Sequence, residues 1–317
     1  MSSTSTRLVA DIGGTNTRIA LFDPGQSELR ALRTYTNREF TQLEDIIALW
    51  LEHLTEPRPG VCCIAVAAPP SDDQVSMTNI DWSFSNSELA SRFGFDQLRR
   101  LNDFEANAYA LPYLTDSERE LLFPAKGEPA GRLATLGPGT GLGGAFLDWH
   151  GGLPQSFACE PGHMGLAPAT QLELELFRLL LAQHSNIYAE LLVSGPGLVR
   201  LQQALGEVRG EPAPALEAAE ISRRAMAGED GLCVTALETF CALFGSVCGD
   251  FLLANGSYGG LYLAGGIVPE ITTFLRASTF RKRLIDKGAM GQTLARIPIY
   301  TITSCQPGLL GAAHVPL

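Results

Sequence analysis

Two glycine-rich turns, each set between short apolar segments, restrict this chain more than any other feature. In the first, the turn 11–18 separates the apolar runs 8–10 and 19–22. In the second, the turn 137–144 interrupts the otherwise apolar stretch 133–149. A tight glycine turn between two apolar runs predicts a β-hairpin. The second half of the chain therefore repeats the opening of the first half.

Apolar segments of strand length and of helix length alternate around these hairpins. We expect strands at 61–68, 98–101, 260–264 and 297–302. Apolar residues at helical spacing predict helices at 40–53, 171–183, 217–227 and 233–253. Shorter helices are expected from Asn102 to Leu111, after the pair Gly265 and Gly266, and from Pro307. This alternation indicates an α/β protein with central sheets, and a cluster of prolines and glycines at 110–130 predicts a domain boundary there.

Composition excludes several classes of protein. The 23 Lys and Arg against 34 Asp and Glu give a net charge of −11, which disfavours a nucleic-acid-binding surface. The apolar region 251–268 is cut by glycines and Asn255 and is shorter than the roughly 20 apolar residues that span a membrane. The N-terminus offers no signal-peptide core, and seven cysteines without a Cys-x-x-Cys pair are typical of reduced thiols in a cytosolic protein. Zinc-ligand spacing is absent from the sequence.

The glycine turns bear on phosphate chemistry. A P-loop is excluded because the chain has no Gly-Lys pair. Gly139-x-Gly141-x-x-Gly144 matches the dinucleotide pattern, but that pattern should lead into a helix and this one leads into an expected strand. Either turn alone is compatible with a plain hairpin; two turns facing each other, with their bare backbone and threonine hydroxyls, could hold a polyphosphate. Asp11 would then lie where Mg²⁺ bridges phosphate oxygens, the alternative being a carboxylate that caps its own turn.

Taken together, the motifs resemble one family, the bacterial glucokinases of the hexokinase/actin-like ATPase superfamily. The resemblance covers nearly the whole chain through motifs in family order, at 8–16 (LVADIGGTN), 77–82 (MTNIDW), 101–104 (LNDF), 136–143 (LGPGTGLG), 160–163 (EPGH), 193–197 (VSGPG) and 263–269 (LAGGIVP). It implies ATP- and Mg²⁺-dependent transfer of the γ-phosphoryl group to the 6-hydroxyl of glucose in the cytoplasm, by a protein that forms a homodimer. It also implies a two-lobed actin-like/ribonuclease H-like fold with mixed central sheets and an active-site cleft between the lobes. We expect a small domain, 1–110 joined by 301–317, and a large domain, 111–300.

The resemblance also assigns residues. Asp103 is the expected general base, although a helix N-cap is its plain structural alternative. The sugar ligands implied are Asn79, Asn102, Asp103, Glu160, His163 and Glu190. An exposed helix charge is the alternative for Glu190. The nucleotide and phosphate contacts implied are Ala10, Asp11, Ile12, Gly13, Gly14, Thr15, Asn16, Gly139, Thr140, Gly141, Gly265 and Gly266, with Asp11 holding Mg²⁺ through water.

Other functions stay open at this point. A kinase for another hexose, such as mannose, fructose or an N-acetylhexosamine, would use the same residues, because one hydroxyl's orientation is read by small displacements. A sugar-sensing regulator would need neither Asp103 nor two phosphate turns. Residues 194–197 are expected to be structural, with a loop role near the sugar as an option. Pro138, Pro161 and the pair Ile80 and Asp81 depart from the family pattern and bear on loop geometry and sugar preference.

Overall fold

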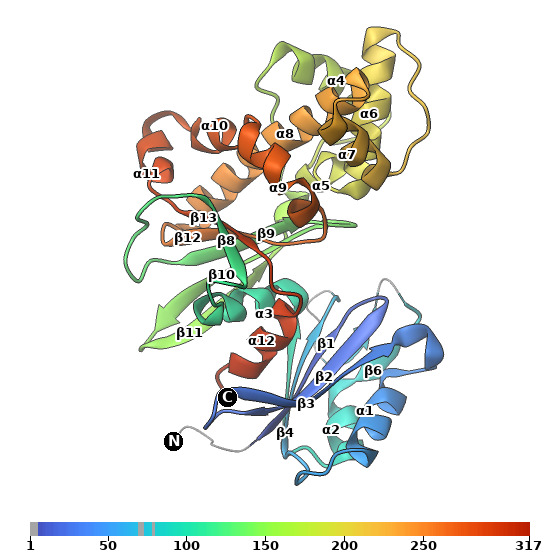
Figure 1. Ribbon diagram of the computed structural model, residues 1–317, viewed down its shortest axis with the longest axis vertical. Coiled ribbons are helices and arrows are strands. Elements are labelled where there is room, and N and C mark those ends of the chain that lie inside the picture. The colour runs from blue at the N-terminus through green and yellow to red at the C-terminus, as the bar shows by residue number, and fades with distance from the viewer. Residues whose placement is uncertain (1–5, 69–72, 78–79) are drawn as a thin grey trace. The chain divides into compact units, whose positions relative to one another are not determined.

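The computed structural model describes residues 6–68, 73–77 and 80–317 of the chain. These residues form two compact units: residues 1–114, 149–158 and 304–317 make the first, and residues 115–148 and 159–303 make the second (Figure 1). The chain thus returns to its first unit at its end. Each unit is built on one main sheet.

The first unit has a five-stranded sheet in the order β3-β2-β1-β4-β7. Its strands are β1 (Arg7–Ile12), β2 (Asn16–Asp23), β3 (Glu28–Thr36), β4 (Val61–Val66) and β7 (Gln97–Asn102), and a separate hairpin joins β5 (Gln74–Ser76) to β6 (Ser83–Ser85). Its helices are α1 (Leu43–Glu52), α2 (Asn86–Phe93), α3 (Asp103–Ala110) and α12 (Pro307–His314), with 3₁₀ turns at Asn37–Glu39 and Leu111–Tyr113. β1 is antiparallel to β2 and parallel to β4, and β4 is parallel to β7.

The second unit repeats this arrangement. Its sheet has the order β11-β10-β9-β12-β13-β8. Its strands are β8 (Arg119–Phe123), β9 (Leu133–Pro138), β10 (Leu142–His150), β12 (Gly260–Leu263) and β13 (Ile299–Ile302). The edge strand of the same sheet is β11 (Leu153–Cys159), although residues 149–158 are grouped with the first unit. Its helices are α4 (Gln171–Leu181), α5 (Ala189–Leu192), α6 (Gly195–Arg209), α7 (Ala218–Ala227), α8 (Gly231–Asn255), α9 (Ile267–Ala277), α10 (Phe280–Ile285) and α11 (Gly291–Ala295), with 3₁₀ turns at Pro161–His163 and Gly288–Met290. In both sheets an antiparallel hairpin is followed by two further parallel strands, so the predicted internal repeat is confirmed.

Alternation along β1 sorts its side chains between two helical layers. α1 and α2 cover one face of the first sheet, and α3 and α12 cover the other (Figure 1). Leu8, Ala10 and Ile12 belong to the buried cluster that contains the apolar side of α1. Because successive strand residues point to opposite faces, Asp11 points toward α12, where its carboxylate lies against Gly308.

The C-terminal helix α12 is fixed firmly within the first unit. The buried Arg7 guanidinium donates hydrogen bonds to the carbonyl oxygens of Ala313 and Val315, at 3.2 and 2.8 Å. His314 stacks on Tyr113 with ring centroids 3.7 Å apart. These contacts tie the last helix of the chain to its first strand.

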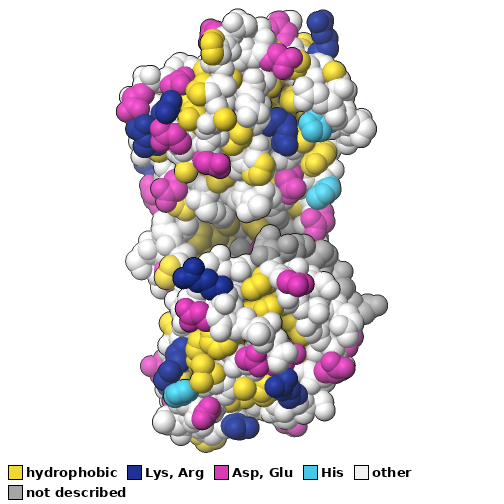
Figure 2. Space-filling view, turned by 90° about the vertical axis from the view of Figure 1, so that its right-hand side faces the viewer, with side chains coloured by type: hydrophobic (Ala, Val, Ile, Leu, Met, Phe, Trp, Pro, Cys, Tyr) yellow, Lys and Arg dark blue, Asp and Glu magenta, His cyan; other side chains and the backbone are white. Residues whose placement is uncertain are grey.

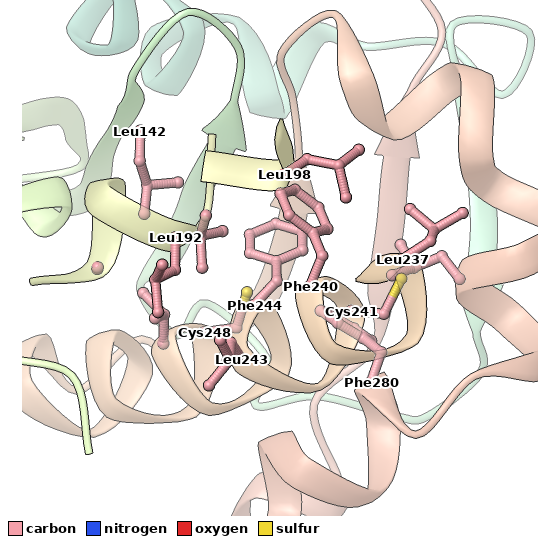
Figure 3. Packing of buried hydrophobic residues seen from close by; sticks show 14 of the residues in the cluster. Leu142, Leu192, Leu198, Leu237, Phe240, Cys241, Leu243, Phe244, Cys248 and Phe280 are labelled. Carbon is pink, nitrogen blue, oxygen red and sulfur yellow. The ribbon is translucent and has the colours of Figure 1, made fainter. Parts of the chain in front are cut away.

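Helix α8 forms the centre of the second unit's core. Phe240 and Phe244 are fully buried there and pack with Phe280 of α10, together with Leu192 and Leu198 (Figure 3). Burial of so many large apolar side chains supplies most of this unit's stability, at roughly 1.5–3 kcal/mol for each.

The same helix corrects one expectation. Among the described residues it is the one helix that is long and apolar enough to cross a membrane, and its 25 residues exceed the apolar region 251–268 considered above. The helix expected at 233–253 is this one, and Glu238 and Asp250 interrupt its apolar pattern in the sequence. A helix that is apolar all round is also typical of a buried core, and 78% of the apolar window lies buried inside the fold.

The surface carries both signs of charge. On the face shown in Figure 2, acidic and basic side chains are interspersed over both units. On this face neither sign of charge is gathered into one patch.

Candidate functional site

In the first unit, the predicted residues gather at the carboxyl edge of the parallel strands. Ile12, Val66 and Asn102 are register partners at the ends of β1, β4 and β7. Asp11 lies next to the end of β1, and Asp103 directly follows the end of β7. Both therefore lie at one edge of the sheet, where β1 and β7 are two strand spacings, or about 10 Å, apart. Loops at the carboxyl edge of such a sheet are the usual place for ligand binding.

The turn between β1 and β2 is held by a buried amide that we did not anticipate. Asn37 is fully buried. Its Nδ2 donates a hydrogen bond to the Gly13 carbonyl oxygen at 2.8 Å, and its backbone N–H donates one to the Thr15 carbonyl oxygen at 2.9 Å. Its Oδ1 accepts a 2.8 Å hydrogen bond from the Thr17 hydroxyl. Asn37 thereby fixes the shape of the turn while Thr15 stays exposed. No local signal in the sequence marks this residue, because its partners lie some 20 residues away.

Two of the residues assigned to phosphate binding have buried side chains. Ala10 and Ile12 are fully buried in the sheet core, so any role they have in ligand binding is through their backbone. Gly13, Gly14 and Asn16 are partly exposed at the turn. The turn is closed by a 3.0 Å hydrogen bond from the Gly13 N–H to the Asn16 carbonyl oxygen.

Asp11 occupies a setting suited to a cation. Its carboxylate is 3.6 Å from the Arg18 guanidinium and packs against Gly308 in the first turn of α12. Burial raises the pKa of the Asp11 carboxyl, and Arg18 opposes that rise. A positive charge close to Asp11 would therefore favour its ionised form.

Asp103 is the first residue of α3, and Asn102 caps the helix. The Asn102 Oδ1 accepts from the backbone N–H groups of Phe104 and Glu105, and the Glu105 carboxylate accepts in turn from the Asn102 N–H, which completes a capping box. The structural alternative for Asp103, an N-cap, is thus wrong by one residue. Asp103 is half-buried at the positive end of the helix, where a carboxylate is stabilised in its ionised form.

In the second unit, two predicted glycine segments pack backbone against backbone. Gly265 has a φ of +82°, which favours glycine, and a Cβ there would lie 2.4 Å from the Pro138 carbonyl oxygen. The turn after β9 closes with a 2.7 Å hydrogen bond from the Gly139 N–H to the Gly141 carbonyl oxygen. The structure therefore brings the 137–144 turn and the 265–266 pair together at the carboxyl ends of β9 and β12.

A pocket of about 970 Å³ opens beside them. Gly139, Thr140 and Gly266 line it, whereas Gly141 and Gly265 are not among its lining residues. Lining residues that we did not predict come from α6, α7 and α9: Gly195, Pro196, Leu198, Val199, Arg200, Gln203, Ala218, Ala219, Ser222, Arg223, Met226, Ile267, Glu270 and Ile271.

The pocket depends on helix α6. The N-cap and first residues of this helix fall in the segment 194–197, for which a loop was one option. Ser194 caps this helix by accepting from the Gly197 N–H at 3.0 Å. The Gly195 N–H donates to the Gly139 carbonyl oxygen at 2.8 Å, which joins the first turn of α6 to the glycine turn. That option of a loop is wrong, because two glycines and a proline fit the start of a capped helix as well as they fit a loop.

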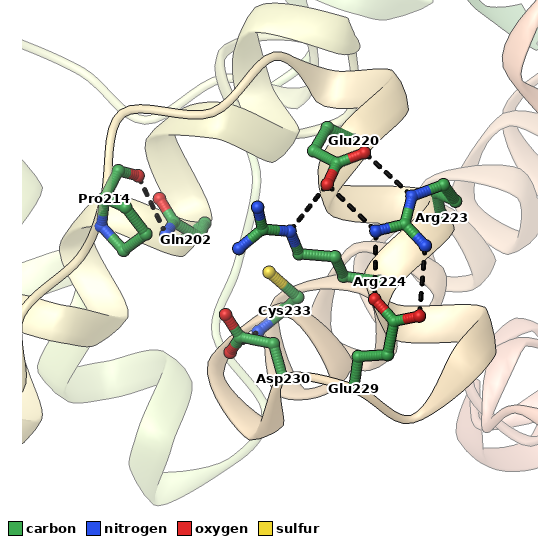
Figure 4. A network of polar contacts seen from close by, with 8 residues as sticks. All are labelled: Gln202, Pro214, Glu220, Arg223, Arg224, Glu229, Asp230 and Cys233. Atoms are coloured by element: carbon green, nitrogen blue, oxygen red, sulfur yellow. Dashed lines mark hydrogen bonds and ion pairs between the residues drawn. The ribbon is translucent and has the colours of Figure 1, made fainter.

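Opposing charges balance one another along α7, at the wall of this pocket. Glu220 accepts hydrogen bonds from Arg223 and Arg224, and Arg223 also pairs with Glu229 (Figure 4). Hydrogen bonds from Arg223 and then Arg224 lower the pKa of Glu220 to about 2. The two arginines and two carboxylates of this network therefore balance one another in charge.

The predicted sugar ligands of the second unit lie on two neighbouring segments. Glu160 precedes the 3₁₀ turn Pro161–His163, and both Glu160 and His163 are exposed. The His163 ring stacks on Tyr188, with centroids 5.7 Å apart and planes 8° apart. Glu190 follows in α5 and is half-buried, with its Oε2 accepting a 2.8 Å hydrogen bond from the Leu142 N–H. Its alternative, an exposed helix charge, is therefore wrong.

The remaining predictions concern Asn79, the dinucleotide pattern and metal ligands. Asn79 lies outside the described residues. The dinucleotide pattern at Gly139–Gly144 runs into strand β10 and not into a helix, which removes the geometry that a dinucleotide fold requires. Within residues 6–68, 73–77 and 80–317, no three His, Cys, Asp or Glu side chains are grouped for direct coordination of a metal ion.

Proteins of known family resemble this chain both in sequence and in structure. The family model described as Glucokinase matches residues 8–316. The chain is 39% identical over 309 residues to the glucokinase of Saccharophagus degradans, covering 96% of each, and 43% identical over 314 residues to that of Aromatoleum aromaticum, covering 98% and 95%. A crystal structure of glucokinase from an Antarctic psychrotroph superposes with a TM-score of 0.90 at 37% identity, over 98% of both chains.

More distant structures share the fold. A ROK family glucokinase from Streptomyces griseus, solved in complex with glucose and AMPPNP, superposes with a TM-score of 0.63 at 18% identity, covering 98% of this chain and 99% of that one. The predicted actin-like ATPase fold is confirmed by these neighbours and by the repeated sheets. The chain belongs to the glucokinase family.

Proposed function

We propose that Asp103 is the general base with which this glucokinase-family enzyme transfers the γ-phosphoryl group of ATP to the 6-hydroxyl of glucose, forming glucose 6-phosphate and ADP. The observation that carries the assignment is the capping box of Asn102 and Glu105, which leaves Asp103 as the first helical residue. A carboxylate held there is kept ionised by the helix N-terminus and is ready to accept the hydroxyl proton. Phosphoryl transfer needs little more from the protein than positioning, charge neutralisation and such an acceptor.

Asp11 is our candidate for holding Mg²⁺ through water. One carboxylate beside a phosphate-binding turn fits the preference of Mg²⁺ for few protein ligands, several waters and substrate phosphates. Burial raises the pKa of the Asp11 carboxyl, and a bound cation would favour its ionised form. When bound, Mg²⁺ would neutralise phosphate charge, and the backbone N–H groups of Gly14 and Thr15 would donate hydrogen bonds to phosphate oxygens.

The nucleotide is proposed to bind in the pocket beside Gly139 and Gly266. Its volume of about 970 Å³ lies within the usual range for small-molecule sites. The backbone near Gly139 and the hydroxyl of Thr140 offer donors to phosphate oxygens, while the charge-matched wall at Arg223 suits the uncharged adenine. We therefore orient ATP with its phosphates toward the glycine turn and its base toward α7.

Sugar hydroxyls are proposed to be read by Asn102 and Asp103 in the first unit and by Glu160, His163 and Glu190 in the second. We keep Asn79 in this set on the resemblance of its motif alone. Carboxylates and imidazoles suit adjacent hydroxyls because each can bond two neighbouring oxygens. The Asn102 Oδ1 already accepts two backbone hydrogen bonds, and the Nδ2 donates one to the Ala68 carbonyl oxygen at 3.3 Å. The second N–H of Nδ2 is therefore the donor that we assign to the sugar.

The direct test measures ADP released from Mg-ATP with glucose, mannose, fructose and N-acetylglucosamine. Asp103→Asn keeps the shape of the side chain but removes the proton acceptor, so we expect glucose to bind while ADP release falls by at least about 10²-fold. Glu88→Gln is the matched control, since Glu88 also lies in the first turn of a helix of the first unit. Strong turnover by Asp103→Asn would refute the base, and a different preferred hexose would move the specificity. Glucose binding without ADP release from the unaltered protein would favour a sugar sensor.

The resemblance further supports a cytoplasmic homodimer. Sedimentation equilibrium of the purified protein tests the dimer directly, and a single species of monomer mass would refute it. Fractionation of the producing cells tests the location.

A further inference from the structure

The carboxylate of Glu190 lies between two turns to which different ligands are assigned. Its Oε2 accepts the Leu142 N–H at 2.8 Å, at the end of the glycine turn that precedes β10. A Cβ at Gly141 would lie 2.5 Å from the same oxygen, and a Cβ at Gly162 would lie 3.1 Å from it. The carboxylate therefore packs directly against the phosphate turn on one side and against the His163 turn on the other.

The backbone around Glu190 is tied to both turns as well. Toward the sugar residues, the Ala189 N–H donates to the Met164 carbonyl oxygen at 2.9 Å. Toward the nucleotide pocket, the Ser194 hydroxyl donates to the Glu190 carbonyl oxygen at 2.8 Å, and Ser194 caps the helix whose Gly195 bonds to Gly139. Residues 188–195 thus form a continuous connection from one turn to the other.

Close packing makes this connection sensitive to small movements. With glycine at positions 141 and 162, the carboxylate fills the space that a side chain would take at either position. A rotation of the Glu190 side chain would break the Leu142 hydrogen bond, and the turn at Gly141 would lose its contact. Packed interiors transmit such displacements because they contain few voids.

We infer that Glu190 couples sugar binding to nucleotide binding, with a sugar hydroxyl holding the carboxylate in the orientation that accepts the Leu142 N–H and so fixes the phosphate turn. The inference rests on the proposed function, in which Glu190 contacts the sugar. Glu190 is then a positioning residue for the nucleotide in addition to a sugar ligand. By reciprocity, the nucleotide must raise sugar affinity by the same factor by which the sugar raises nucleotide affinity.

Calorimetric titration of glucose, alone and with saturating AMPPNP and Mg²⁺, measures this factor. For the unaltered enzyme we expect glucose affinity to rise at least about 5-fold with the nucleotide, the lower end of usual coupling. In Glu190→Ala the ratio should fall close to one. Glu190→Gln retains an oxygen that can accept the Leu142 N–H, so it should bind glucose more weakly but keep most of the ratio.

Glu160→Ala is the matched control, because it removes a proposed sugar contact that has no part in the connection to Leu142. It should weaken glucose binding and leave the ratio unchanged. Glu190→Asp provides a second variant if Glu190→Ala does not fold: its shorter carboxylate cannot reach both partners, so the ratio should again be lost.

The two possible failures are distinguishable. An unchanged glucose affinity of Glu190→Ala without nucleotide would remove Glu190 from the sugar site and contradict the proposed function. A parental ratio in both Glu190→Ala and Glu190→Asp, or a ratio of one in the unaltered enzyme, would overturn the coupling while leaving the sugar contact in place.

Discussion

Gly311→Ala tests the closest helix packing of the first unit. A Cβ at position 311 would lie 1.7 Å from the carbonyl oxygen of Ala106 and 2.5 Å from its carbonyl carbon. Ordinary contact between carbon and oxygen is about 3.3 Å, so α12 and α3 would have to separate by about 1.5 Å along this line. Neither atom can be relieved by a rotamer change, since the obstacle is backbone.

The cost follows from the two effects of the substitution. Overpacking of a tight interior costs about 1–3 kcal/mol and occasionally more, and a clash with backbone belongs at the upper end. The better helix propensity of alanine returns up to about 1 kcal/mol. We expect a net loss of about 2–3 kcal/mol, which lowers Tm by about 5–10 °C at roughly 2–4 °C per kcal/mol.

The same displacement should slow the reaction. Asp103 lies three residues before Ala106 on α3, and a misplacement of about 1 Å at a catalytic group can cost about 10²-fold in rate. Thermal unfolding by circular dichroism and glucose-dependent ADP release measure the two effects on one preparation. Gly231→Ala is the control, because a Cβ there meets nothing within 4 Å. Gly311→Ala with parental Tm and parental kcat would refute the reasoning.

Three further substitutions address other contacts. A Cβ at Gly308 would lie 2.9 Å from the Asp11 carboxylate and would displace it. Gly308→Ala should therefore raise several-fold the Mg²⁺ concentration needed for half-maximal rate. The same substitution should have no such effect in a protein that already carries Asp11→Asn. Glu173→Gln leaves the buried Arg283 guanidinium without its charge partner, which should cost about 3–5 kcal/mol in chemical unfolding. Burial lowers the pKa of His314 below 6.5, so the folded protein favours the neutral imidazole. The free energy of unfolding therefore falls as the pH drops below 6.5. Between pH 7 and 5.5 the Tm of His314→Phe should fall less than the Tm of the unaltered protein.

One result for each substitution would contradict its prediction. An identical Mg²⁺ requirement would separate position 308 from the carboxylate beside it. A small loss of stability in Glu173→Gln would show that water reaches the guanidinium. Parallel pH curves for His314→Phe and the unaltered protein would assign the acid sensitivity to other groups.

Local sequence patterns predicted the strands and helices that depend on nearby residues. Both hairpins form because an apolar run, a glycine turn and another apolar run specify their own pairing, as in the register of Ala10 with Ile19 and of Ala145 with Thr135. Helix α4 forms almost as expected because Thr170 caps it and its apolar residues recur at helical spacing. In these segments the interactions that decide the structure lie within about ten residues.

The rest depends on contacts between distant residues. Nothing near Asn37 indicates that its amide will hold the Gly13 turn, and nothing near Gly308 indicates that it will face Asp11. Neighbouring asparagine and aspartate also hide which of them caps a helix, as Asn102 and Asp103 illustrate, because both are good N-caps. The motifs supplied the candidate site residues, which stay predictions, whereas the residues that support them needed the three-dimensional structure.

The return of α12 to the first sheet has a consequence for synthesis. Residue 102, where that sheet's last strand ends, leaves the ribosome about 200 residues before α12 does, which corresponds to roughly 10–40 s of translation at about 5–20 residues per second. Through this interval the face that α12 covers stays exposed on the nascent chain, while residues 159–303 can already build their own core. The first unit can therefore complete its packing only after translation has passed residue 314.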